Sequence, residues 1–341
     1  MDINVGVVGA TGLVGIEMIK CLEELNNPNI NIFCYASSRS KDKIINTSKA
    51  SYKVEELTED SFNGLDYVLF SGGNAVSEKY APVAVSKGCI VIDNSSFYRM
   101  SKEVPLVSIG SNDKEIYSHK GIIANPNCST IELMRSLKVL DELYGIKKVV
   151  VSTYQSVSGI GKQALEEYSI NQHINLPNYT SFPFPSSNKH YSIKDNVIPQ
   201  IDSFDLESRY TKEELKMTNE TKKILGDHID LIATCVRVPI YRGHAESVYV
   251  ELNNKLNISE FISKIKEDEY LELKDDIVNQ EYPLVRDCYY NKKAIIGRIR
   301  KDLFSEYAVN YFIVGDNLYL GAAYNAVMIL NKLINGEKYE V

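Results

Sequence analysis

Cys128 stands where a cysteine can become a nucleophile. It follows the segment Asn-Pro-Asn at 125–127 and opens a segment, residues 129–145, whose apolar residues recur at helical spacing before a glycine ends it. At a helix N-terminus, unpaired N–H groups and the helix dipole stabilise a thiolate and lower a thiol pKa that is about 8.5 in the free residue. The alternative is a structural cysteine, because free cysteines are among the most buried residues. The position by itself leaves both interpretations open.

His244 is the second candidate for chemistry, because an imidazole whose pKa is near neutrality can accept a proton and return it. A single histidine in a sequence is more often a structural residue than a catalytic one. Three charged residues close to it in the sequence, Arg237, Arg242 and Glu246, favour a functional role here.

Charged residues that suit an anionic substrate occur in two further places. Arg99 follows a predicted strand, residues 89–96, at the carboxyl end where open α/β sheets place their ligands. Glu220 and Lys223 are three positions apart in a predicted helix, residues 211–226, and therefore share one helix face. For Glu220 and Lys223, spacing alone favours an ordinary surface ion pair.

Gly9, Gly12 and Gly15 form a glycine-rich turn after a predicted strand, residues 3–8, and before an amphipathic helix. Glycines permit a tight turn and a close approach of the backbone to pyrophosphate, and the helix N-terminus favours negative charge. A glycine motif alone is weak evidence, but strand before and helix after is the context that a dinucleotide site requires. The alternative is a structural turn.

The end of the second predicted strand, residues 30–38, indicates which dinucleotide binds. An NAD site typically has a carboxylate about 20 residues after the glycines, which binds the ribose 2′-hydroxyl. This chain has Ser38, Arg39 and Ser40 there, and hydroxyls with a guanidinium suit a 2′-phosphate. NADP is therefore favoured over NAD. A solvated loop remains the alternative, and Asp42 complicates the assignment.

The elements that must position these residues change character along the chain. Up to residue 127, short strands rich in valine and isoleucine alternate with helices, which predicts a Rossmann-like, doubly wound parallel sheet of the α/β class. Residues 128–318 read as an α+β catalytic and dimerisation domain, with a long irregular stretch at 176–210. A last helix, at about 319–341, is expected to pack back on the first, NADP-binding domain at 1–127.

Composition excludes several classes of function. The 341 residues carry a net charge of −7, which argues against a nucleic-acid surface. The six cysteines show no CxxC spacing, so neither a disulfide framework nor a metal site is expected. No apolar run approaches the ~20 residues that span a bilayer, and the N-terminus does not resemble a secretory signal. A cytoplasmic protein without a membrane partner is expected.

Seven segments, in order and covering nearly the whole chain, resemble aspartate-β-semialdehyde dehydrogenase. They are GATGLVG at 9–15, DNSSFYRM at 93–100, NPNCST at 125–130, YQSVSGIGKQA at 154–164, NETKKIL at 219–225, CVRVPIYRGHAESV at 235–248 and GDNLYLGAAYNAV at 315–327. The resemblance implies reversible, NADPH-dependent reduction of L-aspartyl 4-phosphate to L-aspartate 4-semialdehyde, through a covalent thioester and with release of inorganic phosphate. It also implies a homodimer that serves lysine, threonine, methionine, isoleucine and diaminopimelate biosynthesis.

The resemblance also implies a role for each matching residue. Cys128 matches the nucleophile, His244 the acid/base group and Gln155 a residue that orients the intermediate. The expected substrate-binding residues are Arg237 for the carboxylate, Glu220 for the ammonium group, and Arg99 with Lys223 for phosphate. The expected cofactor-binding residues are Gly9, Thr11, Gly12, Leu13, Val14, Ser38, Arg39, Ser40, Gly72, Ser158, Gly159 and Asn317.

Two other functions remain open from the sequence. An enzyme like N-acetyl-γ-glutamyl-phosphate reductase would share the two-domain organisation and the thiol, but an N-acylated substrate has no use for a carboxylate at its nitrogen. A catalytically silent NADP-binding homologue is the other alternative. The presence of both Cys128 and His244 argues against it.

Overall fold

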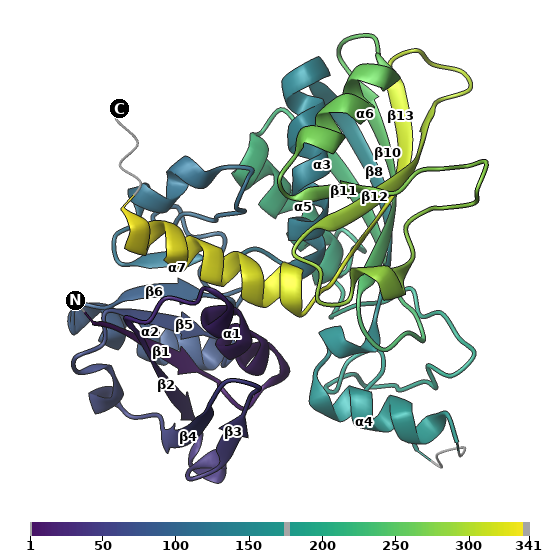
Figure 1. The fold of residues 1–341 in the computed structure, drawn as a ribbon. Helices are drawn as coiled ribbons and strands as arrows, with labels where there is room; N and C mark the ends of the chain where they lie inside the picture. The colour runs from purple at the N-terminus through teal and green to yellow at the C-terminus, as the bar shows by residue number, and fades with distance from the viewer. Residues whose placement is uncertain (1, 174–177, 337–341) are drawn as a thin grey trace. The chain divides into compact units, whose positions relative to one another are not determined.

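The computed structural model describes residues 2–173 and 178–336, and the chain forms two compact units (Figure 1). The first unit contains Met1–Asn127 and Ala322–Val341, and the second contains Cys128–Gly321. Parts of two segments singled out in the sequence, 176–177 and 337–341, lie outside the described residues.

The first unit is built on a seven-stranded sheet with the order β3-β4-β2-β1-β5-β6-β7. Its strands are β1 (Ile3–Val8), β2 (Ile30–Ala36), β3 (Ile44–Asn46), β4 (Ser51–Glu56), β5 (Tyr67–Phe70), β6 (Ile90–Asp93) and β7 (Ile122–Ala124). All neighbouring strands are parallel except β3, which pairs antiparallel with β4. The order of the strands reverses between β1 and β5, and this confirms the prediction of a doubly wound sheet.

Helices α1 (Leu13–Glu24), α2 (Asn74–Ser86) and α7 (Asn325–Asn335) complete the first unit, with short 3-10 turns η1 (Ser38–Ser40), η2 (Glu59–Phe62) and η3 (Asp113–Ser118). The apolar face of α1 buries Met18, Ile19 and Leu22. Helix α7 contacts α1, β5 and β6, so the end of the chain packs on the sheet formed by its beginning.

The second unit is built on a six-stranded mixed sheet with the order β11-β12-β13-β10-β8-β9. Its strands are β8 (Ile146–Gln155), β9 (Asp230–Arg237), β10 (His244–Leu252), β11 (Leu271–Leu273), β12 (Ala294–Lys301) and β13 (Ala308–Gly315). Strand β8 lies between β9, to which it is parallel, and β10, to which it is antiparallel. This mixed sheet confirms the predicted α+β character.

Helices α3 (Cys128–Tyr144), α5 (Lys212–Leu225) and α6 (Ile258–Glu267) pack together on one face of the second sheet (Figure 1). Helix α5 begins with a capping box, in which Thr211 and Glu214 satisfy each other's backbone N–H groups. The unit also contains α4 (Lys162–Asn171), the 3-10 turns η4 (Val157–Gly159) and η5 (Val285–Cys288), and a π-helical turn η6 (Tyr319–Tyr324) that leads into α7.

The irregular stretch predicted after residue 176 is irregular in the structure, because residues 178–210 contain neither a helix nor a strand longer than an isolated bridge. One of these bridges lies at Arg237, a residue predicted to bind the substrate. Ile198 and Arg237 exchange two backbone hydrogen bonds, each 2.9 Å long. The stretch therefore holds the end of β9, which carries one of the predicted substrate residues.

Candidate active site

Cys128 is the first residue of α3, as the helix-start pattern predicted, and it is half-buried whereas the other five cysteines are buried. Burial raises the thiol pKa of Cys34 to about 12 and also raises the thiol pKa of Cys235 and Cys288. Next to Cys128, a Cβ at Gly321 would lie 2.7 Å from its Cβ, so only a glycine leaves space for the reactive residue.

Three predicted site residues occupy a single row across the second sheet, which we call the end row: Arg237, Gln155 and His244. Arg237 ends β9 opposite Gln155, which ends β8, and Gln155 in turn lies opposite His244, the first residue of β10. Residues that are neighbours across a sheet project to the same side. All three are buried on the face that α3 and α5 cover. The end row meets the N-terminus of α3, where Cys128 Sγ lies 3.5 Å from His244 Nε2.

His244 is completely buried. Burial, and then the positive charge of Arg237, lower the pKa of His244 to about 3, although a backbone hydrogen bond with Gly243 and the charge of Glu213 oppose the shift. These surroundings favour the neutral imidazole, and the acid/base role of His244 stays a prediction from the sequence. The Nδ1 atom accepts the backbone N–H of Ser156 at 3.0 Å.

A network of small polar side chains lies behind His244. The Oδ1 atom of Asn317 accepts the backbone N–H of Gly243 at 2.9 Å and the hydroxyls of Ser158 at 3.1 Å and Ser156 at 3.3 Å. Ser156 Oγ is also 3.3 Å from His244 Nδ1. Ser158 and Asn317 were predicted as cofactor contacts. In the second unit they hydrogen-bond to each other, and Asn317 also binds the backbone N–H of Gly243, the residue before His244.

Arg237 and Gln155 are held by groups that the sequence did not single out. Arg237 Nη1 donates to the carbonyl oxygen of Ser156 at 2.7 Å, and Gln155 Nε2 donates to Thr153 Oγ1 at 3.2 Å and Glu213 Oε1 at 3.4 Å. Burial lowers the pKa of the Arg237 guanidinium, and the charge of Glu213 opposes this. Glu213 therefore holds Gln155 and places a negative charge near Arg237.

Gly159, another predicted cofactor residue, lies next to the same guanidinium. A Cβ at Gly159 would approach Arg237 Nη1 to 3.0 Å and His244 Cε1 to 3.6 Å. The absence of a side chain therefore leaves room between two residues of the end row.

Glu220 and Lys223 lie in the interior rather than on an exposed surface. Glu220 is 1% exposed and Lys223 is partly buried, on a helix that packs against both α3 and β9. Burial lowers the pKa of Lys223, and the nearby Glu220 opposes this shift. A buried carboxylate costs considerable free energy unless a cation accompanies it, which favours a binding role over an ordinary surface pair.

Two residues further into each strand lies a second row on the same face of the sheet. It is formed by Cys235, Thr153 and Glu246. Glu132, one helical turn after Cys128 on α3, is completely buried, and a Cβ at Gly315, which lies opposite His244 on β13, would clash with its Cγ. Among the described residues, no hydrogen-bond donor reaches the carboxyl oxygens of Glu132 or Glu246. Burial raises the pKa of both carboxyl groups well above the usual value and thus favours their protonated forms.

Arg242 has a structural role. Its Nε donates to both carboxylate oxygens of Asp316, at 2.9 and 2.8 Å, and its guanidinium stacks 4.0 Å from the ring of Tyr290. Asp316 also accepts the backbone N–H of Leu318 and Tyr319. This buried ion pair therefore fixes the loop that carries Asn317.

The first unit gathers the predicted cofactor residues at the carboxyl edge of its parallel sheet. Gly9 follows β1 with a φ of +81°, and a Cβ there would lie 2.8 Å from the backbone of Ser71, next to Gly72. Gly12 is the N-cap of α1 and has no side chain to satisfy the first N–H groups of that helix, where Leu13 and Val14 begin it. Such a turn fits a pyrophosphate.

The loop after β2 brings further predicted cofactor residues to this edge. Ser38, Arg39 and Ser40 form η1, and Thr11 Oγ1 lies 3.4 Å from Ser40 Oγ. The glycine turn and the proposed 2′-phosphate segment are therefore adjacent. Arg99 follows β6 at the same edge, where its Nη2 donates to the carbonyl oxygen of Asn94 at 2.8 Å.

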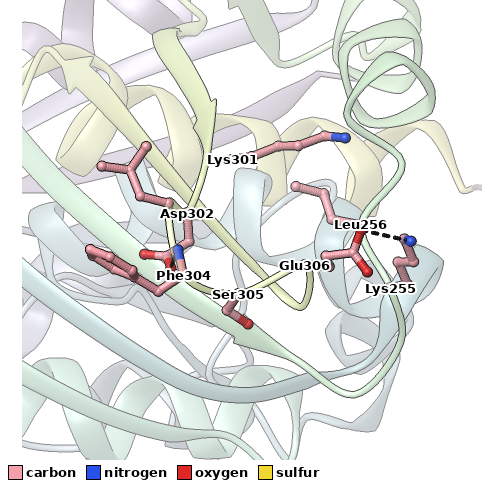
Figure 2. Close-up of a pocket in the computed structure, with 8 residues that line it drawn as sticks. Lys255, Leu256, Lys301, Asp302, Phe304, Ser305 and Glu306 are labelled. Atoms are coloured by element: carbon pink, nitrogen blue, oxygen red, sulfur yellow. Dashed lines mark hydrogen bonds and ion pairs between the residues drawn. The ribbon is translucent and has the colours of Figure 1, made fainter.

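A hollow of about 220 Å³ in the second unit is separate from this site (Figure 2). It lies at the connection between β12 and β13, beside the exposed side chain of Phe304 and an ion pair between Lys255 and Glu306. None of the predicted site residues lines it. Within 2–173 and 178–336, no group of three or more potential ligands could hold a metal ion, and no helix there is long and apolar enough to cross a membrane.

Sequence reasoning missed Ser156, Glu213 and Glu132. Glu132 is four residues after Cys128 and thus on the same helix face, a signal that the sequence did contain. Ser156 acts through its backbone N–H, which no side-chain motif reveals. Glu213 resembles an ordinary acidic residue in the first turn of a helix.

Comparison with known proteins agrees with this arrangement. The family model described as semialdehyde dehydrogenase, NAD binding domain, matches residues 4–119, and the model described as semialdehyde dehydrogenase, dimerisation domain, matches residues 137–320. The aspartate-semialdehyde dehydrogenases of Bacillus subtilis and Campylobacter jejuni are 42% and 40% identical over 337 residues, which cover 97% and 96% of both chains.

A solved structure of aspartate semialdehyde dehydrogenase II from Vibrio cholerae, complexed with ASA, has a TM-score of 0.91 and 36% identity, and the match covers 100% of each chain. The resemblance seen in the sequence motifs is thus confirmed. The chain belongs to the aspartate-semialdehyde dehydrogenase family.

Proposed function

We propose that this oxidoreductase converts L-aspartyl 4-phosphate and NADPH reversibly to L-aspartate 4-semialdehyde, phosphate and NADP⁺, through a thioester at Cys128. The observation that carries the proposal is the 3.5 Å approach of Cys128 Sγ to His244 Nε2, at a helix N-terminus and beside the end row. Aspartate-semialdehyde dehydrogenases of other organisms resemble the chain over almost its full length.

The chemistry of Cys128 follows from its position. The sulfur attacks the carbonyl carbon of the acyl phosphate, the bond from that carbon to the phosphate oxygen breaks, and phosphate leaves with the electron pair. When bound, the reduced nicotinamide supplies the hydride that turns the thioester carbon into an aldehyde carbon. The carbon–sulfur bond then breaks and returns the sulfur of Cys128. His244 Nε2 is in place to serve the oxygen that carries charge between these steps.

The interior of the second unit offers a partner for each charged group of an aspartyl substrate. Arg237 suits the carboxylate, because a guanidinium binds it through two parallel hydrogen bonds. Glu220 suits the ammonium group and Lys223 the phosphate, and Gln155 orients the acyl group next to Cys128. For Arg99, in the first unit, phosphate binding stays a prediction from the sequence.

The charge of Glu220 bears on the alternative substrate. An ammonium group can donate to this carboxylate, whereas the acylated nitrogen of an N-acetyl amino acid carries no charge to match it. The carboxylate therefore supports a free amine over an N-acetyl group. The ASA complex of the Vibrio cholerae relative concerns a substrate of the same kind.

We propose that the cofactor is NADP rather than NAD. The turn from Gly9 to Gly12 would hold the pyrophosphate, and the hydroxyls of Thr11, Ser38 and Ser40 with the guanidinium of Arg39 would bind the 2′-phosphate. A carboxylate there would repel this phosphate. For Gly72, Ser158, Gly159 and Asn317, contact with the nicotinamide half stays a prediction from the sequence.

The second sheet supports a homodimer. Its face opposite α3, α5 and α6 exposes apolar side chains on β8 and on the edge strand β9, including Val150, Tyr154 and Ile232 at 41%, 39% and 39%. Exposed apolar side chains gathered on one face are typical of an interface between subunits. The family model that covers this region is a dimerisation domain. We place the homodimer in the cytoplasm, in the biosynthesis of the aspartate-derived amino acids.

The test is an assay of purified protein with L-aspartate 4-semialdehyde and NADP⁺, followed by absorbance of the reduced nicotinamide. We expect a signal that requires inorganic phosphate and that is weaker with NAD⁺ in place of NADP⁺. N-acetyl-glutamate semialdehyde serves as the matched control substrate and should react poorly. Folded protein that gives no phosphate-dependent signal with the aspartate compound would refute the proposal.

A further inference from the structure

Asp93 is the last residue of β6, at the carboxyl edge of the first sheet, and its side chain is completely buried. Its Oδ1 atom accepts the hydroxyl of Ser77 at 2.7 Å and the backbone N–H of Ser95 at 3.0 Å. Its Oδ2 atom accepts the hydroxyl of Ser95 at 2.6 Å. These three donors are uncharged, and together they satisfy a carboxylate, which can only accept, in the interior of the unit.

The contacts of this carboxylate fold residues 94–99, which we call the Arg99 turn. The Oγ atom of Ser95, which donates to the carboxylate, also accepts the backbone N–H of Phe97 at 3.2 Å. From the far end of the turn, Arg99 Nη2 donates to the carbonyl oxygen of Asn94 at 2.8 Å. Side chains therefore close the turn from both of its ends, and the carboxylate supplies the contacts at the strand end.

Helix α2 anchors the Arg99 turn at a second point. Asn74, the first residue of α2, accepts the backbone N–H of Ser96 at 3.0 Å and donates from Nδ2 to the hydroxyl of Ser96 at 3.0 Å. Ser77, three residues further along α2, makes the contact with Asp93. The turn is thus tied to a helix as well as to the end of a strand.

The backbone of Asp93 also holds the segment that leads to Cys128. Strand β6 pairs with β7, where Ala124 lies opposite Asp93. The carbonyl oxygen of Asp93 accepts the backbone N–H of Asn125, three residues before Cys128, at 2.8 Å. In an acyl phosphate, the phosphate oxygen is bonded to the carbon that the thiol attacks. A phosphate site and a nucleophile for such a substrate must keep a fixed separation, and a single residue holds the segments of both.

We infer that Asp93 is a positioning residue for the phosphate group of the substrate, because its carboxylate holds the Arg99 turn and its backbone holds the segment before Cys128. The inference rests on the proposed function, in which Arg99 binds phosphate, and adds the residue that fixes the place of this guanidinium. Asp93 does not touch the substrate in this role. It acts through Ser95, whose backbone N–H and hydroxyl it orients.

The sign of one effect separates this role from electrostatic repulsion. A negative charge near a bound phosphate repels it, so loss of the charge alone would improve phosphate binding. Asp93→Asn removes the charge and replaces one acceptor oxygen of the turn with a donor. We expect KM for inorganic phosphate, measured with L-aspartate 4-semialdehyde and NADP⁺, to rise by about tenfold, because a displaced binding group loses much of its effect. An unchanged or lower KM would overturn the inference.

Ser95→Ala tests the same link without a change of charge. It deletes the hydroxyl that joins Asp93 to the backbone N–H of Phe97, and it should also raise KM for phosphate by about tenfold. The KM values for L-aspartate 4-semialdehyde and NADP⁺ should stay within about twofold of the wild type. A merely structural defect would lower kcat through the fraction of folded enzyme without this selective rise, and that result would overturn the inference.

Asp113→Asn is the matched control. The carboxylate of Asp113, on η3 of the same unit, accepts the backbone N–H of Gly110 and pairs with Lys332 at 3.2 Å. This variant should lower the melting temperature but keep KM for phosphate. An equal rise of KM in the control would overturn the inference. Arg99→Lys gives the reference effect at the predicted phosphate ligand, and an unchanged KM there would also overturn the inference.

Phosphate binding can be followed without turnover. The ³¹P signal of inorganic phosphate is titrated with the protein in the presence of NADP⁺, and line broadening reports binding. We expect less broadening with Asp93→Asn and Ser95→Ala than with the wild type, and equal broadening by all three would overturn the inference. Wild-type protein that broadens the signal but shows no phosphate-dependent reaction would refute the proposed function and leave the role of Asp93 in phosphate binding intact.

Discussion

The end row and the second row of the second sheet use similar residues for opposite purposes. A thiol and a group capable of acid/base chemistry meet in both places: Cys128 of α3 lies beside His244 of the end row, and Cys235 and Glu246 both belong to the second row. Beside the end row, the thiol is half-buried and the imidazole accepts a backbone N–H. In the second row, burial raises the pKa of both the thiol and the carboxyl group.

Access and hydrogen bonding differ between these two places although the residue types are similar. A thiol becomes a nucleophile where N–H groups and solvent stabilise its anion, and stays inert where burial disfavours charge. We therefore expect Cys128, and not Cys235, to react. Burial favours the protonated forms of Glu132 and Glu246, which limits the negative charge near Cys128.

The strongest test of this difference removes the thiol in each place. Cys128→Ser should reduce turnover by about 10³-fold or more, because a hydroxyl is a far weaker nucleophile at neutral pH. Cys235→Ala should keep most of the activity, since its sulfur contacts Met217 in the interior. Steady-state rates measure both effects, with cofactor binding as the check on folding. Equal losses would mean that the two places do not differ in reactivity.

A smaller effect is expected when the cation of the end row changes shape but not charge. Arg237→Lys should lower kcat/KM by about 10–100-fold, mainly through KM, because an ammonium group cannot form the paired hydrogen bonds with a carboxylate. The exposed Arg300, whose guanidinium donates to the Arg298 carbonyl, provides the matched control as Arg300→Lys. A KM unchanged by the first substitution would remove Arg237 from substrate binding.

The smallest expected effect is a change in the free energy of unfolding, caused by Glu246 in the second row. Because burial raises the pKa of Glu246, the folded chain holds this proton more tightly than the unfolded chain does. The resulting stabilisation is complete below the unfolded pKa of about 4.3 and declines as pH rises towards the folded pKa, by up to about 1.4 kcal/mol for each pH unit.

Glu246→Gln removes this dependence, so the variant should gain stability relative to the wild type between about pH 5 and about pH 8. Denaturant unfolding at several pH values measures the difference. Glu251→Gln, on the same strand but paired with Lys147 at 2.7 Å near the surface, is the control and should show a flatter trend. A constant difference for Glu246→Gln would mean that its carboxyl group is not held neutral.

Much of the first unit could be predicted from the sequence because its signals are local. The strand before Gly9 and the helix after Gly12 are each marked by apolar spacing within a few residues, and the parallel sheet follows from their alternation. The antiparallel pair of β3 and β4 was missed. With three residues in β3, periodicity gives no signal.

The second unit was harder to predict from the sequence, because its site depends on the register between strands that are distant along the chain. The sequence identified Cys128, Gln155, Arg237 and His244 through a helix start and a family resemblance, but not the shared row, since nothing local places β8 between β9 and β10. It also predicted an acid/base role for His244, which stays a prediction. The complete burial of the imidazole and its hydrogen bond from the backbone of Ser156 could not be read from residue types.

The central place of β8 also governs when the chain becomes reactive during folding. Ser156 is 81 positions from Arg237 and 88 from His244, so both partners of the turn after β8 arrive late in synthesis. Contacts over such separations form slowly, because loop closure must precede them. An emerging or partly folded chain therefore exposes Cys128 before its histidine partner is in place. The pair of Cys128 and His244 is therefore complete only once the sheet is complete.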